Sequence, residues 1–477
     1  MGLKRLFYPE SIAVLGASPN MGGGKIPYLQ VMQMLGYTGA LYPVNPKYND
    51  ISGLQSYPSI DDLPEGVDLV IASVPAAEAL NTVKAAARKK VRFLHFFTSG
   101  FSEAGNRSLE TQILEEAAKG RTRIVGPNCI GIHCADSRVS FTPETQGDIP
   151  KEVAFLGQSG GTTSNFVGMA MARRIGLNKV VSYGNQIDVA AEDYLAYFAG
   201  DEKIRVIAGY LEDIKNPRKF LKALKEATRS KPVVILKGGM TRQGARAAAS
   251  HTGALSSNHT IWSSAIRQHG GVLVDTIEGM LDFVMMAVSK RTAHGRRLGF
   301  LGAGGGVAVS FTDLSALAGL SLPELEPATQ KMIGLKIRAI NTSTTNPVDL
   351  GFYGFDFDVM AHTIRALAKD SNIDVIIPYF SADYIAVAQL DKMESGPEAI
   401  IRAADESTKP VIPVLSKFAE TNMDVERVRV SVFSAFRKAG LPVYGTIQDL
   451  ICATGKYLEW LNRPSRHRPE ENPPFLT

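Results

Sequence analysis

The chain has 477 residues, of which 45% are hydrophobic and 21% charged, and its 52 basic and 47 acidic side chains give a net charge of +5. This length corresponds to about three domains of ordinary size, and the composition is typical of a globular protein with true hydrophobic cores. The mild positive charge does not indicate nucleic-acid binding, and the lack of any run of about 18 apolar residues predicts no membrane span.

The first region, residues 1–140, alternates apolar runs with helical patterns. Strands are expected at residues 11–16, 40–45, 67–74, 92–97 and 123–126, with helices at residues 76–89 and 108–118 between them. Strands that alternate with helices at this spacing predict a doubly wound parallel sheet.

Two further regions repeat this plan. The second, residues 147–290, carries expected strands at residues 151–156, 180–182, 206–211 and 232–236 and closes near residues 284–289. The third, residues 295–465, follows a basic linker and carries expected strands at residues 297–301, 374–378 and 410–415. A tail rich in proline and arginine begins at residue 463, and we expect it to be poorly ordered. Each region opens with a strand that runs into a glycine-rich turn, so the predicted fold class is α/β.

The first glycine-rich turn, residues 16–25, follows the first expected strand. Its glycines let backbone N–H groups approach a phosphate at a helix start, but the Gly-x-Gly-x-x-Gly spacing of a dinucleotide fingerprint is missing. After the second strand, a nicotinamide enzyme usually has an acidic residue that holds the ribose hydroxyls, whereas this chain has Lys47. Lys47 suits a phosphate better than a free ribose. The sequence therefore disfavours a nicotinamide dehydrogenase. For the turn itself, the alternative to a phosphate site is an ordinary turn that binds no ligand.

Two more glycine-rich turns open helices in the second and third regions. Their residues are Ser159, Gly160, Gly161 and Thr162 in one turn, and Gly304, Gly305 and Gly306 in the other. Small residues and hydroxyls at a helix N-terminus form an anion site through the helix dipole and the free N–H groups. Two such helix starts that faced each other would hold a phosphoryl group, although either alone is also compatible with a close-packing turn.

One histidine stands out because of its neighbours: His251 lies between Ser250 and Thr252 in a loop of small polar residues. A neutral imidazole in an exposed loop is a good nucleophile toward phosphorus near neutral pH. Glu212 follows an expected strand and would lie at the ligand edge of its sheet, where its carboxylate could fix the histidine tautomer. The alternatives are an unreactive loop histidine and a structural glutamate.

The cysteines and histidines indicate a reducing compartment and argue against a disulfide framework and a metal site. The three cysteines, Cys129, Cys134 and Cys452, are an odd number in a long chain, which fits a reducing cytoplasm better than a disulfide framework. Cys129 has His133 nearby in sequence but is expected to be a buried structural thiol. The histidines are scattered and no Cys-x-x-Cys pair occurs, so we expect no metal site.

Six motifs occur in order along nearly the whole chain. They are VLGAS at residues 14–18, YPVNPK at 42–47, IVGPNC at 124–129, QSGG at 158–161, AASHTG at 248–253 and TNPVD at 345–349. Together they resemble the NDP-forming acyl-CoA synthetases, the superfamily that includes succinyl-CoA synthetase. The resemblance is strongest to the alpha subunit of ADP-forming acetyl-CoA synthetases. It implies an N-terminal Rossmann-like CoA-binding domain followed by two flavodoxin-like doubly wound domains.

The resemblance also implies roles for individual residues. It implies a set of residues that contact coenzyme A, to which we add Gly16 of the first turn. The resulting set is Gly16, Ser18, Pro19, Asn20, Met21, Lys47, Thr98, Ser99 and Gly100. The phosphorylated histidine of the family falls on His251, and its orienting carboxylate falls on Glu212. The two helix starts that hold the phosphohistidine fall on residues 159–162 and 304–306. These are the same elements that the residues themselves indicate.

Some features depart from the family pattern. Residues 22–24 are three consecutive glycines, and Tyr183 stands where a smaller residue is expected, which suggests an altered acyl pocket. An ATP-grasp domain would need about 200 further residues, and all three regions are already assigned. The resemblance therefore implies an ATP-grasp beta subunit as partner in a hetero-oligomer, with ATP or ADP and magnesium bound to that partner.

We therefore expect the CoA-binding, phosphohistidine-bearing subunit of an acid–CoA ligase. It would interconvert acyl-CoA, ADP and phosphate with acid, CoA and ATP, through an acyl phosphate and phosphorylated His251. Its small-molecule partners would be a carboxylic acid and the acyl-CoA, with no nucleic acid and no membrane. The rival hypothesis is a non-catalytic, regulatory CoA-binding protein with the same fold.

Overall fold

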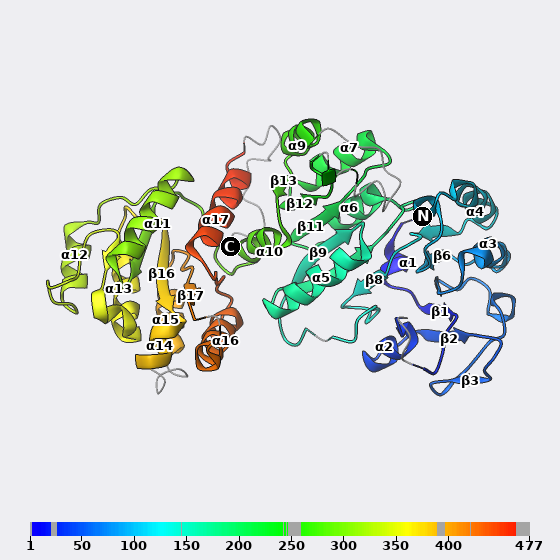
Figure 1. Ribbon diagram of the computed structural model, residues 1–477, viewed down its shortest axis with the longest axis horizontal. Coiled ribbons are helices and arrows are strands. Elements are labelled where there is room, and N and C mark those ends of the chain that lie inside the picture. Colours follow the sequence, from blue (N-terminus) through cyan, green and yellow to red (C-terminus); the bar gives the residue numbers. More distant parts are fainter. Residues whose placement is uncertain are drawn as a thin grey trace. The chain divides into compact units, whose positions relative to one another are not determined.

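The computed structural model describes residues 2–20, 26–144, 146–241, 243–244, 246, 259–388, 396–419 and 421–463 (Figure 1). It consists of two compact units, unit 1 (Met1–Ile277) and unit 2 (Glu278–Pro464). Among the described residues, unit 1 contains two large sheets and a small two-stranded sheet at residues 50–55, and unit 2 contains one sheet. The first large sheet lies in the first predicted region, and the second lies in the second predicted region apart from the strand at residues 131–134. The boundaries at residues 1–140, 147–290 and 295–465 stay predictions.

The first sheet of unit 1 is parallel, with strand order β2-β1-β5-β6-β7. The strands are β1 (Ser11–Leu15), β2 (Ala40–Val44), β5 (Leu69–Ala72), β6 (Phe93–Phe96) and β7 (Arg123–Val125). All five confirm predicted strands. Every residue of β5 and β6 is buried, as expected for strands covered on both faces. Pro43 cannot donate to a ladder, and it lies in the edge strand β2, where this is tolerated.

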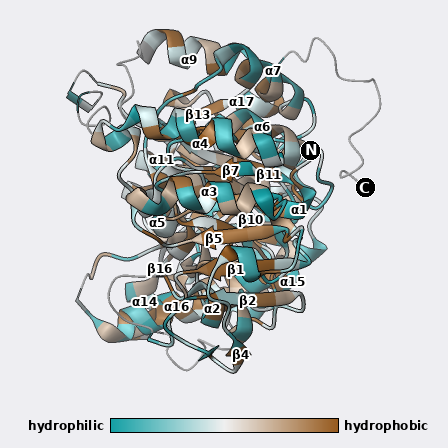
Figure 2. Cartoon of the chain, turned by 90° about the vertical axis from the view of Figure 1, so that its right-hand side faces the viewer, coloured by the Kyte–Doolittle hydropathy of each residue, from teal (hydrophilic) through white to brown (hydrophobic). Residues whose placement is uncertain are grey.

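Helices and short elements complete this part of unit 1. They are α1 (Lys4–Phe7), α2 (Tyr28–Met34), β3 (Asp50–Ile51), β4 (Leu54–Gln55), η1 (Ile60–Asp62), η2 (Ala76–Glu78), α3 (Ala79–Arg88), η3 (Ser102–Ala104) and α4 (Arg107–Gly120). The two predicted helices are therefore confirmed as α3 and α4. Figure 2 colours much of β5 as hydrophobic, whereas α3 and α4 carry hydrophilic segments, so the core of this part lies at the sheet.

The strand order places a ligand crevice in the first sheet. From β1 the chain moves to β2 on one side, and β5 then pairs with β1 on its other side. In doubly wound sheets, ligands bind beyond the carboxyl ends of the strands at such a reversal. Gly16 directly follows β1 and Ser73 directly follows β5, so both residues lie at this point.

The second sheet of unit 1 has strand order β13-β12-β11-β9-β10-β8, and only β8 runs antiparallel to its neighbour. Its strands are β8 (Gly131–Cys134), β9 (Lys151–Gly157), β10 (Gly176–Ser182), β11 (Val206–Leu211), β12 (Val233–Lys237) and β13 (Val272–Val274). The four predicted strands are confirmed, while β8 and β13 were not foreseen. Its helices are α5 (Gly160–Ala172), α6 (Ala191–Ala199), α7 (Pro217–Ala227) and α9 (His259–Gln268).

Unit 2 has a four-stranded parallel sheet of order β15-β14-β16-β17. Its strands are β14 (Leu298–Gly302), β15 (Val348–Asp349), β16 (Val375–Ser381) and β17 (Val414–Ser416). The run at residues 410–415 was predicted as one strand, but β17 begins only at Val414. Pro410 and Pro413 lack the N–H groups that a longer ladder needs.

Helices and a short 3-10 element make up the rest of the described part of unit 2. They are α10 (Ile277–Ala287), α11 (Gly305–Leu317), α12 (Pro327–Gly334), η4 (Gly351–Phe355), α13 (Phe357–Lys369), α14 (Ala382–Ala388), α15 (Gly396–Glu406), α16 (Met423–Lys438) and α17 (Ile447–Leu461). The apolar run expected to close the second region thus begins inside helix α10, which belongs to unit 2 apart from its first residue. In the described ranges, no helix is long and apolar enough to cross a membrane.

Candidate functional site

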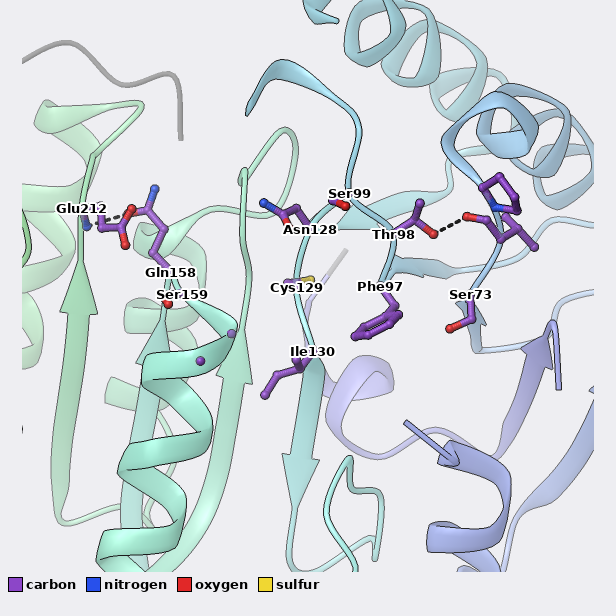
Figure 3. A pocket seen from close by; sticks show the side chains of 14 residues that line it. Ser73, Phe97, Thr98, Ser99, Asn128, Cys129, Ile130, Gln158, Ser159 and Glu212 are labelled. Atoms are coloured by element: carbon purple, nitrogen blue, oxygen red, sulfur yellow. Dashed lines mark hydrogen bonds between the residues drawn. The ribbon is translucent and has the colours of Figure 1, made fainter. Parts of the chain in front are cut away.

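A cavity of about 630 Å³ lies between loops that follow the strands of both sheets of unit 1 (Figure 3). From the first sheet come residues 73–75, after β5, and residues 97–99, after β6. Residues 128–130 come from the connection to β8, and residues 158–161 and Glu212 come from the second sheet. The cavity size falls in the range of small-molecule sites, roughly 300–1,000 Å³.

This cavity brings together residues for which the sequence predicts two different roles. Thr98 and Ser99 were expected to contact coenzyme A, and Ser159, Gly160, Gly161 and Glu212 were expected to serve the phosphoryl group; all six line the cavity. Two lining residues, Ser73 and Asn128, were not predicted from the sequence. Ser73 lies near the end of an expected strand and Asn128 lies in the motif at residues 124–129, so their places close to strand ends were the available signal.

The start of helix α5 forms one wall of the cavity. Ser159 is the N-cap residue, and its side chain accepts a hydrogen bond from the Thr162 N–H at 3.3 Å. The first N–H groups of a helix have no partner within the helix, and they carry the positive end of its dipole. Gly160 and Gly161 line the cavity. A Cβ atom on Gly161 would meet nothing within 4 Å, so packing does not require a glycine there.

Glu212 is held by the residue that precedes this helix start. The side-chain oxygen of Gln158 accepts hydrogen bonds from the backbone N–H groups of Glu212 and Asp213, both at 2.8 Å. The backbone N–H of Gln158 donates to the Tyr210 carbonyl oxygen at 3.0 Å. Gln158 is only 4% exposed, and Figure 3 shows its side chain reaching toward Glu212. The turn at α5 and the end of β11 are thus joined by three hydrogen bonds.

Charged and phenolic groups surround Glu212. Lys237, at the end of β12, donates from Nζ to the Glu212 carbonyl oxygen at 2.9 Å and also to the Gly238 carbonyl. Burial lowers the pKa of Lys237, and the nearby Asp213 and Glu212 charges oppose this shift. The pKa of Tyr210 is raised, first by burial and then by the Glu212 charge. The site is therefore a partly buried region in which the charges of Lys237 and Glu212 interact.

The crevice of the first sheet has a glycine that its geometry requires. Gly16 has φ +85°, and a Cβ atom there would lie 2.7 Å from the Ser73 carbonyl oxygen. Beyond it, Ser18 Oγ accepts the Asn20 N–H at 3.1 Å. Gly16, Ser18, Asn20 and Ser73 line a second, smaller cavity. Predicted coenzyme A residues therefore lie at the carboxyl ends of β1 and β6.

The residues at this edge fit a ligand of the coenzyme A type. Ser73 lines both cavities, and in the described part of the chain its buried hydroxyl has no hydrogen-bond partner. An orphaned buried hydroxyl is unusual in a protein without ligand and suits a polar group of a bound molecule. Gly100 has φ +111°, and its N–H donates to Glu103 at 2.5 Å, which shapes the loop after β6.

The exposed lysine of this edge is placed by the backbone. Lys47 follows β2, and its N–H donates to Asn45 Oδ1 at 3.0 Å. Asn45 in turn donates to the Ala17 carbonyl at 2.7 Å, which ties this turn to the turn after β1. Pro19 lies in that turn beside Ser18. Lys47 does not line either cavity, so any contact with a ligand would be made outside them.

Cys129 lines the main cavity, and its side chain is buried. Burial raises the pKa of its thiol to about 12, which keeps it protonated near neutral pH. Its carbonyl lies 3.0 Å from His95 Nε2, and burial lowers the pKa of His95 to about 4. His133 instead contacts Ser140, at 2.9 Å. The expected burial of Cys129 is confirmed.

Several predicted features lie elsewhere. His251 and Met21 fall outside the described residues. Tyr183 is fully buried and packs on Tyr194 with ring centroids 5.6 Å apart, and it is not a lining residue of the cavity. The suggestion that Tyr183 reshapes a pocket is therefore not supported by its position, because its ring belongs to the core of unit 1.

The third glycine-rich turn belongs to unit 2. Gly304 is the N-cap residue of α11, with φ +108°, and Gly305 and Gly306 form the first turn of that helix. The Gly304 N–H donates to Asp349 Oδ1 at 3.1 Å, and the same oxygen accepts the Gly351 N–H at 2.9 Å. The turn is an open helix start, as the sequence predicted.

Comparison with known families identifies two parts of the chain. Residues 10–135 match the family described as a CoA binding domain, and residues 150–287 match the succinyl-CoA ligase like flavodoxin domain. The predicted Rossmann-like and flavodoxin-like architecture is therefore confirmed for these parts.

Individual relatives cover more of the chain. The ADP-forming acetate–CoA ligase I of Archaeoglobus fulgidus is 32% identical over 393 residues, which are 81% of this chain and 56% of that protein. This chain thus spans little more than half of that relative. Subunit alpha of the ADP-forming acetate–CoA ligase I of Pyrococcus furiosus is 30% identical over 489 residues, covering 98% of this chain and 100% of the subunit.

One solved structure extends the similarity to the fold of nearly the whole chain. It is the dinucleotide forming acetyl-coenzyme A synthetase 1 of Ca. Korarchaeum cryptofilum in complex with phosphate and ADP. The TM-score is 0.84 at 29% identity, and the match covers 96% of this chain and 97% of that one.

Proposed function

The chain belongs to the alpha-subunit family of ADP-forming acetate–CoA ligases, and from this premise we propose that it is the CoA-binding, phosphohistidine-bearing subunit of an acid–CoA ligase. The reaction interconverts acyl-CoA, ADP and phosphate with acid, CoA and ATP. The observation that carries the proposal is the shared cavity of unit 1. It joins Thr98 and Ser99 of the CoA-binding domain to the α5 helix start and Glu212.

The first step occurs at the thioester of acyl-CoA. A phosphate oxygen attacks the carbonyl carbon, an O–C bond forms, the C–S bond breaks, and the CoA thiol leaves with the proton. The product is an acyl phosphate. Residues 159–162 bind the phosphate, with the N–H groups of Gly160 and Gly161 as donors because the Thr162 N–H is held by Ser159 Oγ, and the dipole of α5 stabilises its negative charge. Residues 304–306 at the start of α11, in unit 2, are a further phosphate-binding segment that the family resemblance implies.

The second step transfers the phosphoryl group to His251. An imidazole nitrogen attacks phosphorus, the N–P bond forms, the P–O bond breaks, and the carboxylate of the acid leaves. Glu212 accepts the N–H of the other imidazole nitrogen, which fixes the tautomer and stabilises the cation. Gln158 acts through Glu212 as a positioning residue. Covalent transfer through a histidine divides one difficult exchange into two easier ones.

The third step needs a nucleotide site, and we assign it to a partner subunit. The relatives named alpha subunits imply a second subunit. We propose that this partner is an ATP-grasp beta subunit in a hetero-oligomer, and that it binds ADP or ATP with magnesium. The phosphohistidine passes its phosphoryl group to ADP there. The free thiols Cys129, Cys134 and Cys452 support a reducing, cytoplasmic setting for the complex.

The contacts with coenzyme A follow the edge of the first sheet. We propose that Gly16, Ser18, Pro19, Asn20, Met21, Lys47, Thr98, Ser99 and Gly100 surround it, and that Ser73 adds a hydroxyl. Three domains, at residues 1–140, 147–290 and 295–465, carry these functions.

The test is phosphorylation of the full chain from the acyl-CoA side, which needs no partner. The chain is incubated with radioactive phosphate and a panel of acyl-CoA thioesters, and we expect protein-bound phosphate that is acid-labile and base-stable. His251→Asn should abolish the label, and Glu212→Gln should slow labelling by about ten- to ten-thousand-fold. The exposed His294→Asn is the matched control and should label normally. CoA binding without any label on the wild-type chain would instead favour the regulatory alternative.

A further inference from the structure

The loop after β10, residues 183–189, packs against a segment that lines the main cavity of unit 1. The backbone N–H of Asn185 donates to the Pro127 carbonyl oxygen at 3.0 Å. Gly184 has φ +50°, and a Cβ atom there would clash with the carbonyl oxygens of Pro127 and Asn128. The backbone of this loop is therefore in direct contact with the segment that carries the lining residue Asn128.

The side chain of Asn185 joins the same loop to the segment after β6. Its Nδ2 donates to Glu103 Oε2 at 2.6 Å, to Glu110 Oε1 at 2.9 Å and to Ser102 Oγ at 3.3 Å. Asn185 is only 4% exposed, so water competes little for these hydrogen bonds. One amide group from the second sheet thus holds two carboxylates of the first.

Glu103 passes this contact on to the residues expected to bind coenzyme A. Its Oε1 accepts hydrogen bonds from the backbone N–H groups of Gly100 and Phe101 at 2.5 and 3.1 Å. Burial alone would raise the pKa of Glu103, but the hydrogen bonds from Asn185, Gly100 and Phe101 lower it below its usual value. The carboxylate therefore stays charged near neutral pH and links Asn185 to the coenzyme A loop, residues 98–100.

The next residue, Gln186, joins the loop after β10 to the other wall of the cavity. Its Nε2 donates to the Asp213 carbonyl oxygen at 3.1 Å, and Gln158 accepts the Asp213 N–H at 2.8 Å. The residue directly after Glu212 is thus held on both sides by a buried amide. Figure 3 shows residues 98–99 on one side of the cavity and Glu212 on the other, so adjacent side chains of one loop hold both walls.

The two amides are not explained by a gain in stability. Asn185 Oδ1 and Gln186 Oε1 are buried and, in the part of the chain that the structure describes, have no hydrogen-bond partner. Buried acceptors are almost always paired, and an unpaired one destabilises the fold. What each amide provides is its N–H donor, which makes the contact to one wall of the cavity.

We propose that Asn185, with Gln186 beside it, is a positioning residue for thioester cleavage, because it holds the coenzyme A loop in place against the wall that carries Glu212. The inference rests on the proposed function. Neither residue lines the cavity, so both act through the groups that they hold. Phosphate must reach the thioester carbon in a near-attack geometry, and a misplacement of about 1 Å can cost about 100-fold in rate. Coenzyme A and phosphate each bind to one wall, so their separate binding does not need this connection.

The test compares two phosphoryl donors for labelling His251 of the full chain. Acetyl-CoA with radioactive phosphate requires both walls, whereas radioactive acetyl phosphate bypasses the thioester and requires only the phosphate side. Asn185→Asp replaces the donor amide by a carboxylate of the same shape. We expect labelling at saturating acetyl-CoA to slow by about 10- to 100-fold, while labelling from acetyl phosphate and the CoA affinity measured by calorimetry change by less than about threefold.

A double variant checks the route through Glu103. In Asn185→Asp with Glu103→Gln, the side chain at position 103 keeps an oxygen for Gly100 and Phe101 and can donate its amide N–H to residue 185. Labelling from acetyl-CoA should be about three- to tenfold faster than with Asn185→Asp alone. Asn81→Asp makes the same chemical change at an exposed position of α3 and should label as the wild type does. No recovery in a folded double variant would overturn the role of Glu103.

Two further variants keep the test decisive. Asn185→Ala removes the donor without adding a charge, and it should slow labelling from acetyl-CoA alone even if Asn185→Asp fails to fold. Gln186→Met acts on the wall of Glu212 and should slow labelling from both donors, whereas the exposed Gln112→Met should slow neither.

The outcomes separate this inference from the proposed function. A wild-type chain that is labelled from neither donor would refute the proposed function. A labelled wild type, together with Asn185 variants that label normally from acetyl-CoA or that slow equally with both donors, would overturn the positioning role alone.

Discussion

Gln158 holds the backbone of Glu212 through its side-chain oxygen, at 2.8 Å from the Glu212 N–H. The neighbouring N–H of Asp213 shares this oxygen, also at 2.8 Å. Because Gln158 directly precedes the N-cap Ser159, one residue joins the start of helix α5 to the backbone of Glu212. A single buried side chain therefore connects the turn before α5 with the end of β11.

Replacing Gln158 by leucine should uncouple these elements. The two N–H groups at Glu212 and Asp213 would lose their acceptor, which costs about 1–3 kcal/mol of stability for each buried unpaired group. We expect phosphorylation of His251 to slow by about 10- to 100-fold while CoA affinity changes little. Labelling rates and CoA calorimetry measure the two effects. Gln112→Leu, at an exposed position of α4, is the matched control, and equal labelling of both variants would show that Gln158 has no positioning role.

Gly161→Ala should separate stability from activity. The added methyl group meets no atom within 4 Å, and alanine favours a helix over glycine by about 0.5–1 kcal/mol, so the thermal midpoint should stay or rise. The methyl group would nevertheless lie at the cavity wall where phosphate is expected to bind. We therefore predict that half-maximal labelling will need a higher phosphate concentration than in the wild type. Gly157→Ala is the contrasting variant. Its Cβ would lie 2.1 Å from Thr163 Oγ1, so it should destabilise the fold. If Gly161→Ala needed the same phosphate concentration as the wild type for half-maximal labelling, residue 161 would not be part of the phosphate site.

Lys47→Glu tests whether the exposed lysine after β2 reads a phosphate of coenzyme A. A charge reversal should weaken CoA by more than it weakens dephospho-CoA or pantetheine, because only a ligand phosphate would lose an ion pair. Calorimetric titration of the three ligands gives the comparison. Lys89→Glu, at the end of α3, is a control for the change in net charge. Equal weakening for all three ligands would mean that Lys47 binds no phosphate.

The two buried histidines predict loss of stability in mild acid. Burial lowers the pKa of both His95 and His133 to about 4, below the usual value of about 6.5. The unfolded chain therefore takes up protons first as the pH falls. The contribution of the two histidines to the free energy of unfolding is therefore fully present above about pH 6.5. It declines toward pH 4, by up to about 1.4 kcal/mol per pH unit for each histidine. Urea unfolding at pH 7 and pH 5 should show a smaller decline for His133→Gln than for the wild type. The exposed His294→Gln should decline as the wild type does, and an unchanged decline in His133→Gln would refute this cause.

Much of the fold follows from local sequence signals. Long apolar runs such as those of β5 and β11 are buried on both sides, and the pattern alone identified them. The short strands β8 and β13 were not predicted, because four or three residues carry too little periodicity. Strand β17 begins later than predicted, because Pro410 and Pro413 cannot donate to a ladder. At the site, the glycine turns and Glu212 were visible as strand-end features. Ser73 and Gln158 were not recognised, because their roles depend on contacts between loops distant in sequence.

Strand β8 gives the chain a further property. Gly131–Cys134 follows directly after the cavity residue Ile130, yet it is hydrogen-bonded to β10 at the edge of the second sheet. The loop that lines the cavity is therefore anchored at one end in each sheet. A fragment ending at residue 140 would carry a strand without its partner, and a fragment beginning at residue 147 would expose β10 as an unpaired edge. We therefore expect that replacing residues 1–140 by the corresponding segment of a relative will preserve the fold only when β8 and β10 are matched as a pair.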